Sequence, residues 1–234
     1  KKALLIHVLI PVKTFMAAIP WAAGVLFVAL LGHLVGGPVR ALLVGSLMLA
    51  TAAVGLWQAT MLTVYLCAVS VAAAALLGIP LGILAGRSPA AAGIILPVVD
   101  MLQTLPAFVY LIPAIMFFGA GDFPAFIAIT AYAICPAIRF TELGIRSVPA
   151  SLTEAGTQFG MTRLQRLWTI ELPAAAPQLL LGLNGTIVMA LSMLVVTALI
   201  GTKDLGRETL TALARVDPGR SFTAGLAVAC LAVI

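Results

Sequence analysis

The sequence predicts an all-α polytopic membrane protein, and three observations support this class. Of the 234 residues, 62% are hydrophobic and only 9% are charged, which is too little charge to cover the surface of a soluble domain of this size. Apolar runs of about 20 residues, long enough to cross a ~30 Å hydrocarbon core as helices, recur along the chain. The alternation over segments of about ten residues that is typical of a β-barrel is absent from the sequence.

The apolar runs predict seven membrane segments. The first six cover residues 15–35, 41–57, 61–85, 94–118, 123–140 and 177–200, and the seventh follows Arg220. The fourth contains Pro97, Pro106 and Pro113, which predict kinks or a broken helix. Because the chain begins at Lys1 and stops inside an apolar run, we expect it to be part of a longer protein.

Glycines at a spacing of four residues predict close helix packing. Gly78, Gly82 and Gly86 lie on one face of the third segment, and Gly32 and Gly36 on one face of the first. The three cysteines all lie in apolar runs without metal-ligand spacing, and we interpret them as small core residues. No metal site is expected.

The net charge of +5 fits a membrane protein better than a nucleic-acid-binding one. The basic residues lie between apolar runs, as the positive-inside rule predicts, so the expected partner is the lipid bilayer and no nucleic acid. The count of basic residues on the two sides is nearly even, and it does not decide the orientation.

One polar loop, residues 141–176, interrupts the apolar sequence. Ser151 and Glu154 have the spacing of a capping box at the start of a short helix over 152–159, and Gly160 suits the left-handed residue that ends it. Thr162 and Gln165 form a second capping box, for a helix that we expect to stop before Pro173. Such a loop is either a solvated linker or a rigid element that docks into a partner.

The loop resembles the EAA motif of ABC importer permeases. The matching residues, at full spacing, are Glu154, Ala155, Gly160, Ile170, Leu172 and Pro173. The sequence departs from the motif at Gly156, where the family usually has alanine. Residues 78–85, 96–113, 189–193 and 201–217 resemble the glycine betaine/proline betaine permease subfamily, so the similarity extends from about residue 55 to the end of the chain.

The resemblance implies the transmembrane domain of a type I ABC importer. Residues 1–57 would be accessory membrane helices, and residues 58–234 the permease core with a cytoplasmic EAA loop. The helix over 152–159 would be the coupling helix that docks into a cytoplasmic ATPase. The residues implied to couple to that ATPase are Glu154, Ala155, Gly156, Phe159, Gly160, Ile170, Leu172 and Pro173.

The resemblance also implies partners and a location. The partners are a cytoplasmic ABC ATPase subunit, an extracytoplasmic substrate-binding protein and a second permease copy in a homodimer, in the inner (cytoplasmic) membrane. The sequence has no Gly-rich phosphate loop ending in Lys-Ser/Thr, so we expect a non-catalytic chain without a bound cofactor. ATP and Mg would bind the partner ATPase.

A second group of polar, aromatic and sulfur-containing residues is a candidate translocation path. Asp100, Gln103 and Thr104 share one helix face, and a carboxylate within a membrane segment tends to face the bundle interior or a water-filled path. The other candidates are Phe108, Tyr110, Met189, Ser192 and Met193. The alternatives are that Asp100 lies at the interface or caps a break near Pro97, and that the others simply pack between helices.

The cargo suggested by the subfamily is glycine betaine, proline betaine or choline. Aromatic faces attract quaternary ammonium groups, which fits such a cargo. The alternatives are the same machinery with another small solute such as trimethylamine N-oxide, or an ion-coupled secondary transporter. Residues 201–220 form a second polar stretch, either an outer gate or binding-protein contact or a surface linker.

Overall fold

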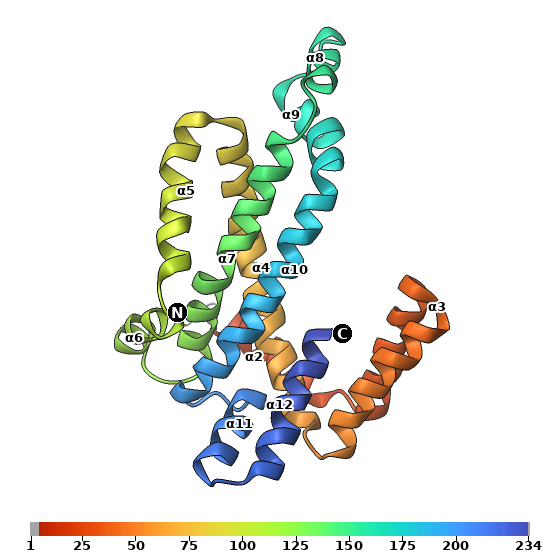
Figure 1. The fold of residues 1–234 in the computed structure, drawn as a ribbon, viewed down its shortest axis with the longest axis vertical. Coiled ribbons are helices and arrows are strands. Elements are labelled where there is room, and N and C mark those ends of the chain that lie inside the picture. Colours follow the sequence, from red (N-terminus) through yellow and green to blue (C-terminus); the bar gives the residue numbers. More distant parts are fainter. Residues whose placement is uncertain (1–4, 234) are drawn as a thin grey trace. The chain divides into compact units, whose positions relative to one another are not determined.

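The computed structural model describes residues 5–233, and that part of the chain forms helices and short connections only (Figure 1). Lys1 to Leu4 and Ile234, which belong to the two predicted parts of the chain, lie outside the described residues. The elements are η1 Leu5–Leu9, α2 Ile10–Ala18, α3 Trp21–Ala53, α4 Trp57–Arg87, α5 Pro89–Thr104, α6 Ala107–Phe118, α7 Asp122–Arg146, α8 Ala150–Gln158, α9 Arg163–Arg166, η2 Leu167–Glu171, α10 Leu172–Thr197, η3 Ala198–Ile200, α11 Leu205–Ala214 and α12 Pro218–Val233.

The all-helical membrane class is confirmed, whereas seven membrane spans are not shown. Within residues 5–233, four helical stretches are long and apolar enough to cross a membrane: α3, α4, α7 and the continuous stretch Arg163–Ile200. A fifth span is present if α5 and α6, which are sharply bent at a short break, count as one. The predicted seventh segment is α12, which at 16 residues is shorter than the about 20 that a span needs.

The predicted first and second segments are the two arms of α3. Gly36 and Gly37 have non-helical backbone angles, with φ +77° at Gly37, so the helix turns sharply there. The arms fold back on each other, since a methyl group added to Gly45 would lie 3.2 Å from Ala29 Cβ. Glycine tolerates the positive φ, and this explains why the apolar run is interrupted at this point.

The described chain divides into two compact units, and the long helices α4, α7 and α10 each contribute to both. Unit 2 comprises Ser70–Val109 and Thr130–Ala190, and unit 1 the described residues up to Val69, Tyr110–Ile129 and those from Leu191 onward. The sequence-based division into residues 1–57 and 58–234 stays a prediction.

In unit 2, small residues let three helices approach closely. Methyl groups added to Gly78, Gly82 and Gly86 would lie 2.5–2.8 Å from Ala137, Thr141 and Ile145 of α7, so the predicted glycine face is confirmed and α4 and α7 run parallel. Gly182 of α10 faces Phe140, and Gly144 of α7 faces Gln178, so α7 and α10 run antiparallel. The charged ends of α4 and α7 therefore lie at the same end of unit 2 as the start of α10.

In unit 1, the start of α4 is tied to the segment before α11. The Leu205 backbone N–H donates to Thr63 Oγ1 at 3.0 Å, and Gly206 is packed against the backbone of Leu194 and Val195. The α6–α7 turn is closed by a bond from the Gly121 N–H to the Ile200 carbonyl at 3.1 Å. Unit 1 thus gathers the starts of α4, α7 and α11 around one place.

Candidate functional site

The first short helix of the polar loop, α8, lies beyond the ends of α7 and α10 (Figure 1). It begins at Ala150, directly after Pro149, and no side chain caps its first turn. The predicted capping box of Ser151 and Glu154 is therefore wrong. The helix starts two residues earlier than expected, which places Ser151 inside the first turn, where its backbone angles are helical and its hydroxyl cannot act as the N-cap.

The end of α8 confirms the predicted glycine corner. Gly160 has φ +75°, and the Gly160 N–H donates to the Thr157 carbonyl at 3.0 Å. Two apolar side chains of this region face outward, since Leu152 is 46% exposed and Phe159 84% exposed. Glu154 is exposed as well. The outer face of α8 thus combines apolar side chains with one carboxylate.

The inner face of α8 is packed against the segment that follows the corner. Gly156 is buried, and a methyl group at this position would lie 2.7 Å from Ile170 Cδ1 and 3.4 Å from Met161 Sδ. The departure from the family motif at Gly156 therefore has a local reason. Alanine fits there only if the flexible end of Ile170 moves aside.

The second half of the loop begins as expected and ends differently. The Thr162 capping box is confirmed: the Gln165 N–H donates to Thr162 Oγ1 at 3.3 Å, and the Thr162 N–H donates to Gln165 Oε1 at 2.8 Å. The expectation that Pro173 stops the helix is wrong, because the chain remains helical from Arg163 to Ile200. A π turn over Leu167–Glu171 precedes the proline, and its wider turn accommodates a residue that lacks an N–H.

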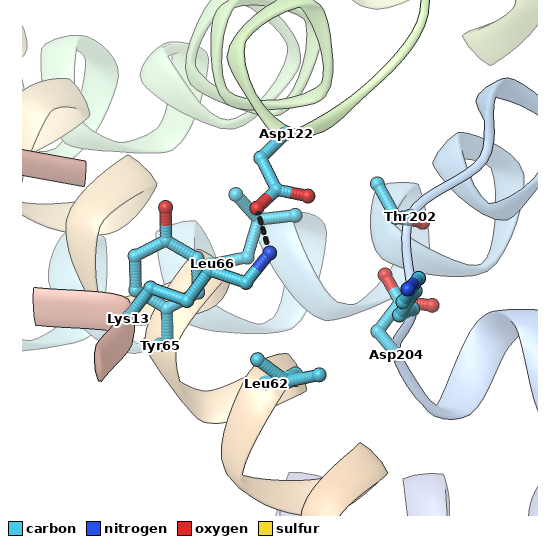
Figure 2. A pocket seen from close by; sticks show the side chains of 8 residues that line it. Lys13, Leu62, Tyr65, Leu66, Asp122, Thr202 and Asp204 are labelled. Carbon is cyan, nitrogen blue, oxygen red and sulfur yellow. Dashed lines mark hydrogen bonds and ion pairs between the residues drawn. The ribbon is translucent and has the colours of Figure 1, made fainter. Parts of the chain in front are cut away.

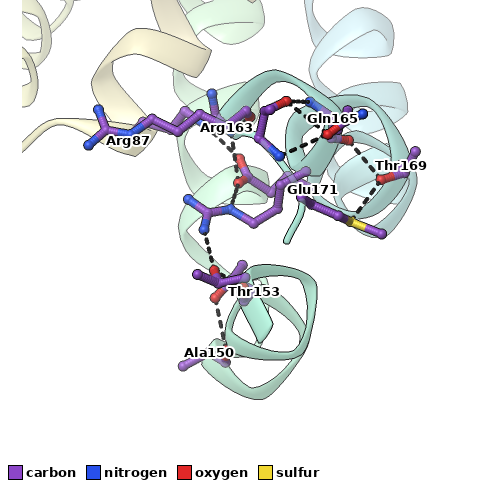
Figure 3. Close-up of polar contacts among 11 residues, drawn as sticks. Arg87, Ala150, Thr153, Arg163, Gln165, Thr169 and Glu171 are labelled. Carbon is purple, nitrogen blue, oxygen red and sulfur yellow. Dashed lines mark hydrogen bonds and ion pairs between the residues drawn. The ribbon is translucent and has the colours of Figure 1, made fainter. Parts of the chain in front are cut away.

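A cluster of two arginines and one glutamate lies inside this loop (Figure 3). Glu171 is only 6% exposed, and its two oxygens accept from Arg87 Nε at 2.7 Å, Arg87 Nη2 at 2.9 Å and Arg166 Nε at 3.1 Å. Arg166 Nη1 also donates to Thr157 Oγ1 of α8 at 2.8 Å, and Arg87 Nη2 to the Arg163 carbonyl at 2.8 Å. We call Arg87, Arg166 and Glu171 the Arg–Glu cluster. Sequence reasoning missed it, although Glu171 lies within the recognised motif.

Among the candidate path residues of unit 2, the structure assigns Asp100 a partner. Asp100 on α5 forms an ion pair with Arg139 of α7. Helix α5 continues through Pro97 and ends at Thr104, so Asp100 does not cap a break near that proline, and the predicted break occurs at Pro106 instead. Gln103, Thr104 and Phe108 are exposed on unit 2, and Met189 is half-buried. Their role in translocation stays a prediction.

The candidate path residues of unit 1 differ among themselves. Met193 is fully buried and Ser192 exposed on α10, while Tyr110 is half-buried on α6. For Met193 the burial favours ordinary packing between helices. The structure describes no group of three or more His, Cys, Asp or Glu side chains that could hold a metal ion within residues 5–233.

Unit 1 also contains a small polar pocket that the sequence did not predict (Figure 2). Lys13 of α2 pairs with Asp122 at the start of α7 at 2.5 Å. Asp204 is 2% exposed; its Oδ1 accepts from the Arg207 N–H at 3.1 Å, but its Oδ2 and the Tyr65 hydroxyl have no hydrogen-bond partner. Burial raises the pKa of the Asp204 carboxyl, against the opposing effect of the Arg207 N–H. The only signal in the sequence was the polar run 202–204 after an apolar helix.

Comparison with known proteins identifies the class. Residues 78–234 match the family described as "Binding-protein-dependent transport system inner membrane component". A chain of a methionine ABC transporter solved in an inward-facing conformation has the same fold, with a TM-score of 0.70 at 19% identity, over 75% of this chain and 88% of that one. The chain therefore belongs to the binding-protein-dependent inner-membrane permease components, as the EAA resemblance predicted.

The most similar relatives carry two kinds of name. A trimethylamine N-oxide transport system permease protein of Ruegeria pomeroyi is 39% identical over 97% of this chain and 35% of its own length. A glycine betaine/proline betaine transport system permease protein of Escherichia coli is 41% identical over 80% of this chain and 53% of its own. A glycine betaine/carnitine transport permease protein of Listeria monocytogenes is 42% identical over 76% and 63%. The chain thus spans about a third to two thirds of the length of these relatives.

Proposed function

We propose that this chain is the membrane-spanning permease subunit of an ABC importer for a small compatible solute. The observation that carries the proposal is the polar loop, because it combines the EAA spacing with a short helix whose apolar side chains face outward. The inner-membrane family and the names of the relatives support the same function. ATP hydrolysis would take place on a separate cytoplasmic subunit, and an extracytoplasmic binding protein would deliver the solute.

Helix α8 is the proposed ATPase-docking element. Leu152 and Phe159 would enter an apolar groove of the ATPase, and Glu154 would set the register, as in other complexes where a helix lies in a groove. Ala155, Gly156, Gly160, Ile170, Leu172 and Pro173 would support this helix rather than touch the partner. This assignment places the loop in the cytoplasm and the pocket of unit 1 toward the other face of the membrane.

The docking role is tested by reversing one charge. Glu154→Lys should weaken association of the intact permease with its ATPase subunit, measured by co-purification and by surface binding. Glu208→Lys, the same change at an exposed glutamate of α11, is the matched control and should leave association unchanged. Equal association of both variants with the ATPase would contradict the docking role of α8.

The cargo is proposed to be a betaine or trimethylamine N-oxide. Both are small molecules with a quaternary or oxidised tertiary nitrogen, and the relatives of both kinds have similar identity to this chain. Trimethylamine N-oxide is a specific second candidate because its permeases match 97–99% of the chain, whereas the glycine betaine/proline betaine permeases match 80%.

Uptake measurements separate these cargoes. The intact permease, in proteoliposomes with its ATPase and binding protein, should accumulate one labelled solute only when ATP is present. Competition by unlabelled glycine betaine, choline and trimethylamine N-oxide then ranks the candidates. Uptake that persists without the ATPase subunit would contradict the ABC importer function and favour an ion-coupled transporter.

A further inference from the structure

The Arg–Glu cluster joins three segments of the chain that are far apart in sequence. Arg87 is the last residue of α4, Glu171 ends the π turn η2, and Arg166 ends α9. Arg166 in turn donates to Thr157 on α8. Every link of this chain of bonds lies within unit 2 (Figure 3).

The geometry makes Glu171 the centre of the cluster. Arg87 binds both of its oxygens through a fork of two N–H groups, the arrangement that makes arginine–carboxylate pairs strong and directional. The Glu171 side chain is 6% exposed and that of Arg87 28%, so water screens the pair less than it screens a surface ion pair. A neutral residue at position 171 would leave two arginines facing each other without a counter-charge.

The cluster is the polar connection between α8 and the end of a membrane helix. Thr157 is itself bound into α8, because its hydroxyl donates to the Thr153 carbonyl at 2.8 Å. On the opposite side, α4 is held to α7 by the packed glycines at positions 78, 82 and 86. A displacement of α8 is therefore passed through Arg166 and Glu171 to α4, and from α4 to α7.

We propose that Glu171, held by Arg87 and Arg166, is a positioning residue that makes α8 and the end of α4 move as one body. The proposal rests on the proposed function, because it gives α8 the role of receiving the movement of the ATPase. It adds that the force reaches the membrane helices through α4, and that a residue outside the matched motif positions carries it. Glu171 itself touches neither the ATPase nor the solute.

The principal variant is Glu171→Gln in the intact transporter with its ATPase and binding protein. The glutamine keeps the size of the side chain and removes the charge that both arginines share. We expect association with the ATPase to stay unchanged, while the solute taken up per ATP hydrolysed falls about tenfold, within the usual range of coupling between sites. A merely structural role would lower the amount of folded complex and leave this ratio constant.

Two further variants grade the effect. Glu171→Asp keeps the charge on a shorter side chain and should restore part of the ratio. Arg163→Ala is the matched control, because it removes a positive charge from the same loop while keeping the Arg163 carbonyl that Arg87 binds. It should leave the ratio as in the unmodified transporter.

A measurement of position separates failure of this inference from failure of the proposed function. Spin labels at positions 158 and 90, both exposed on unit 2, report the distance between the end of α8 and the segment after α4. Glu171→Gln should broaden that distance distribution in the permease alone, whatever the cargo or partner. A distribution and an uptake ratio both equal to those of the unmodified protein would overturn the proposal.

Discussion

Glu171 and Asp204 are two buried carboxylates that satisfy their oxygens in different ways. Glu171 accepts three N–H groups from two arginine side chains, so its charge is paired. Asp204 accepts the Arg207 backbone N–H at the start of α11 with one oxygen, and its other oxygen has no hydrogen-bond partner. The first arrangement ties separate segments together, whereas the second mainly caps a helix and leaves a carboxyl group that favours its protonated form.

The largest effect is expected from breaking the paired arrangement. Arg87→Ala leaves Glu171 with Arg166 alone and should lower the free energy of unfolding by about 3 kcal/mol, since removing one partner of a buried pair leaves an uncompensated charge. Thermal unfolding of the purified permease measures the loss. Arg220→Ala is the control, because Arg220 is 75% exposed and its pair with Asp217 should contribute only about 0.5 kcal/mol. Equal losses for both variants would contradict the distinction.

The next effect separates packing from charge at the same end of α4. A methyl group at Gly82 would lie 2.6 Å from the Ile138 carbonyl oxygen, which cannot move without shifting α7. Gly82→Ala should therefore cost about 2 kcal/mol. Gly93→Ala, where no atom lies within 4 Å, should leave the melting temperature unchanged or raise it by up to about 1 kcal/mol in stability.

A smaller effect is expected at the helix cap next to the cluster. Thr162→Ala removes both capping-box bonds of the Thr162 hydroxyl and should cost about 1 kcal/mol. Hydrogen exchange at the first turn of α9 is the most direct measurement. Ser151→Ala, where the predicted cap does not form, should change exchange in α8 little. A larger effect at Ser151 than at Thr162 would show that the caps are assigned the wrong way round.

The unpaired carboxyl predicts a dependence on pH. Because burial raises the pKa of Asp204, the folded protein holds this proton more tightly than the unfolded chain does. The stability that this provides is complete below the ordinary aspartate pKa of about 3.9 and is lost as the pH rises through the higher folded value. Asp204→Asn can still accept the Arg207 N–H, and its melting temperature relative to the unmodified protein should rise from pH 4.5 to 7.5. A constant difference would contradict the prediction.

The smallest effect concerns the motif position that departs from the family. Gly156→Ala gains helix propensity of about 1 kcal/mol, but the new methyl group meets Ile170 Cδ1 at 2.7 Å. We expect these contributions nearly to cancel. Ile170→Val removes that atom, so the double variant should be more stable than the sum of the single changes, as a double-mutant cycle in thermal unfolding would show.

Several features of this chain followed from local sequence alone. The long apolar runs required helices, because a chain in hydrocarbon must satisfy its backbone groups internally. Gly160 and Thr162 were assigned correctly, since a left-handed corner and a capping box depend on residues within a few positions of each other. The spacing of the glycines on α4 predicted a close approach, although it did not name the helix that approaches.

The tertiary structure decided what depends on distant residues. The Arg87–Glu171 pair joins positions 84 apart in sequence, and the Asp100–Arg139 pair gives the candidate path residue a partner that no local pattern indicates. The false cap at Ser151 and the helix through Pro173 have the same origin, because packing against neighbouring segments can override a local signal of about 1 kcal/mol. Hydrophobicity and local backbone preference thus determined the class and the loop, while long-range pairing determined how the loop is connected to the membrane helices.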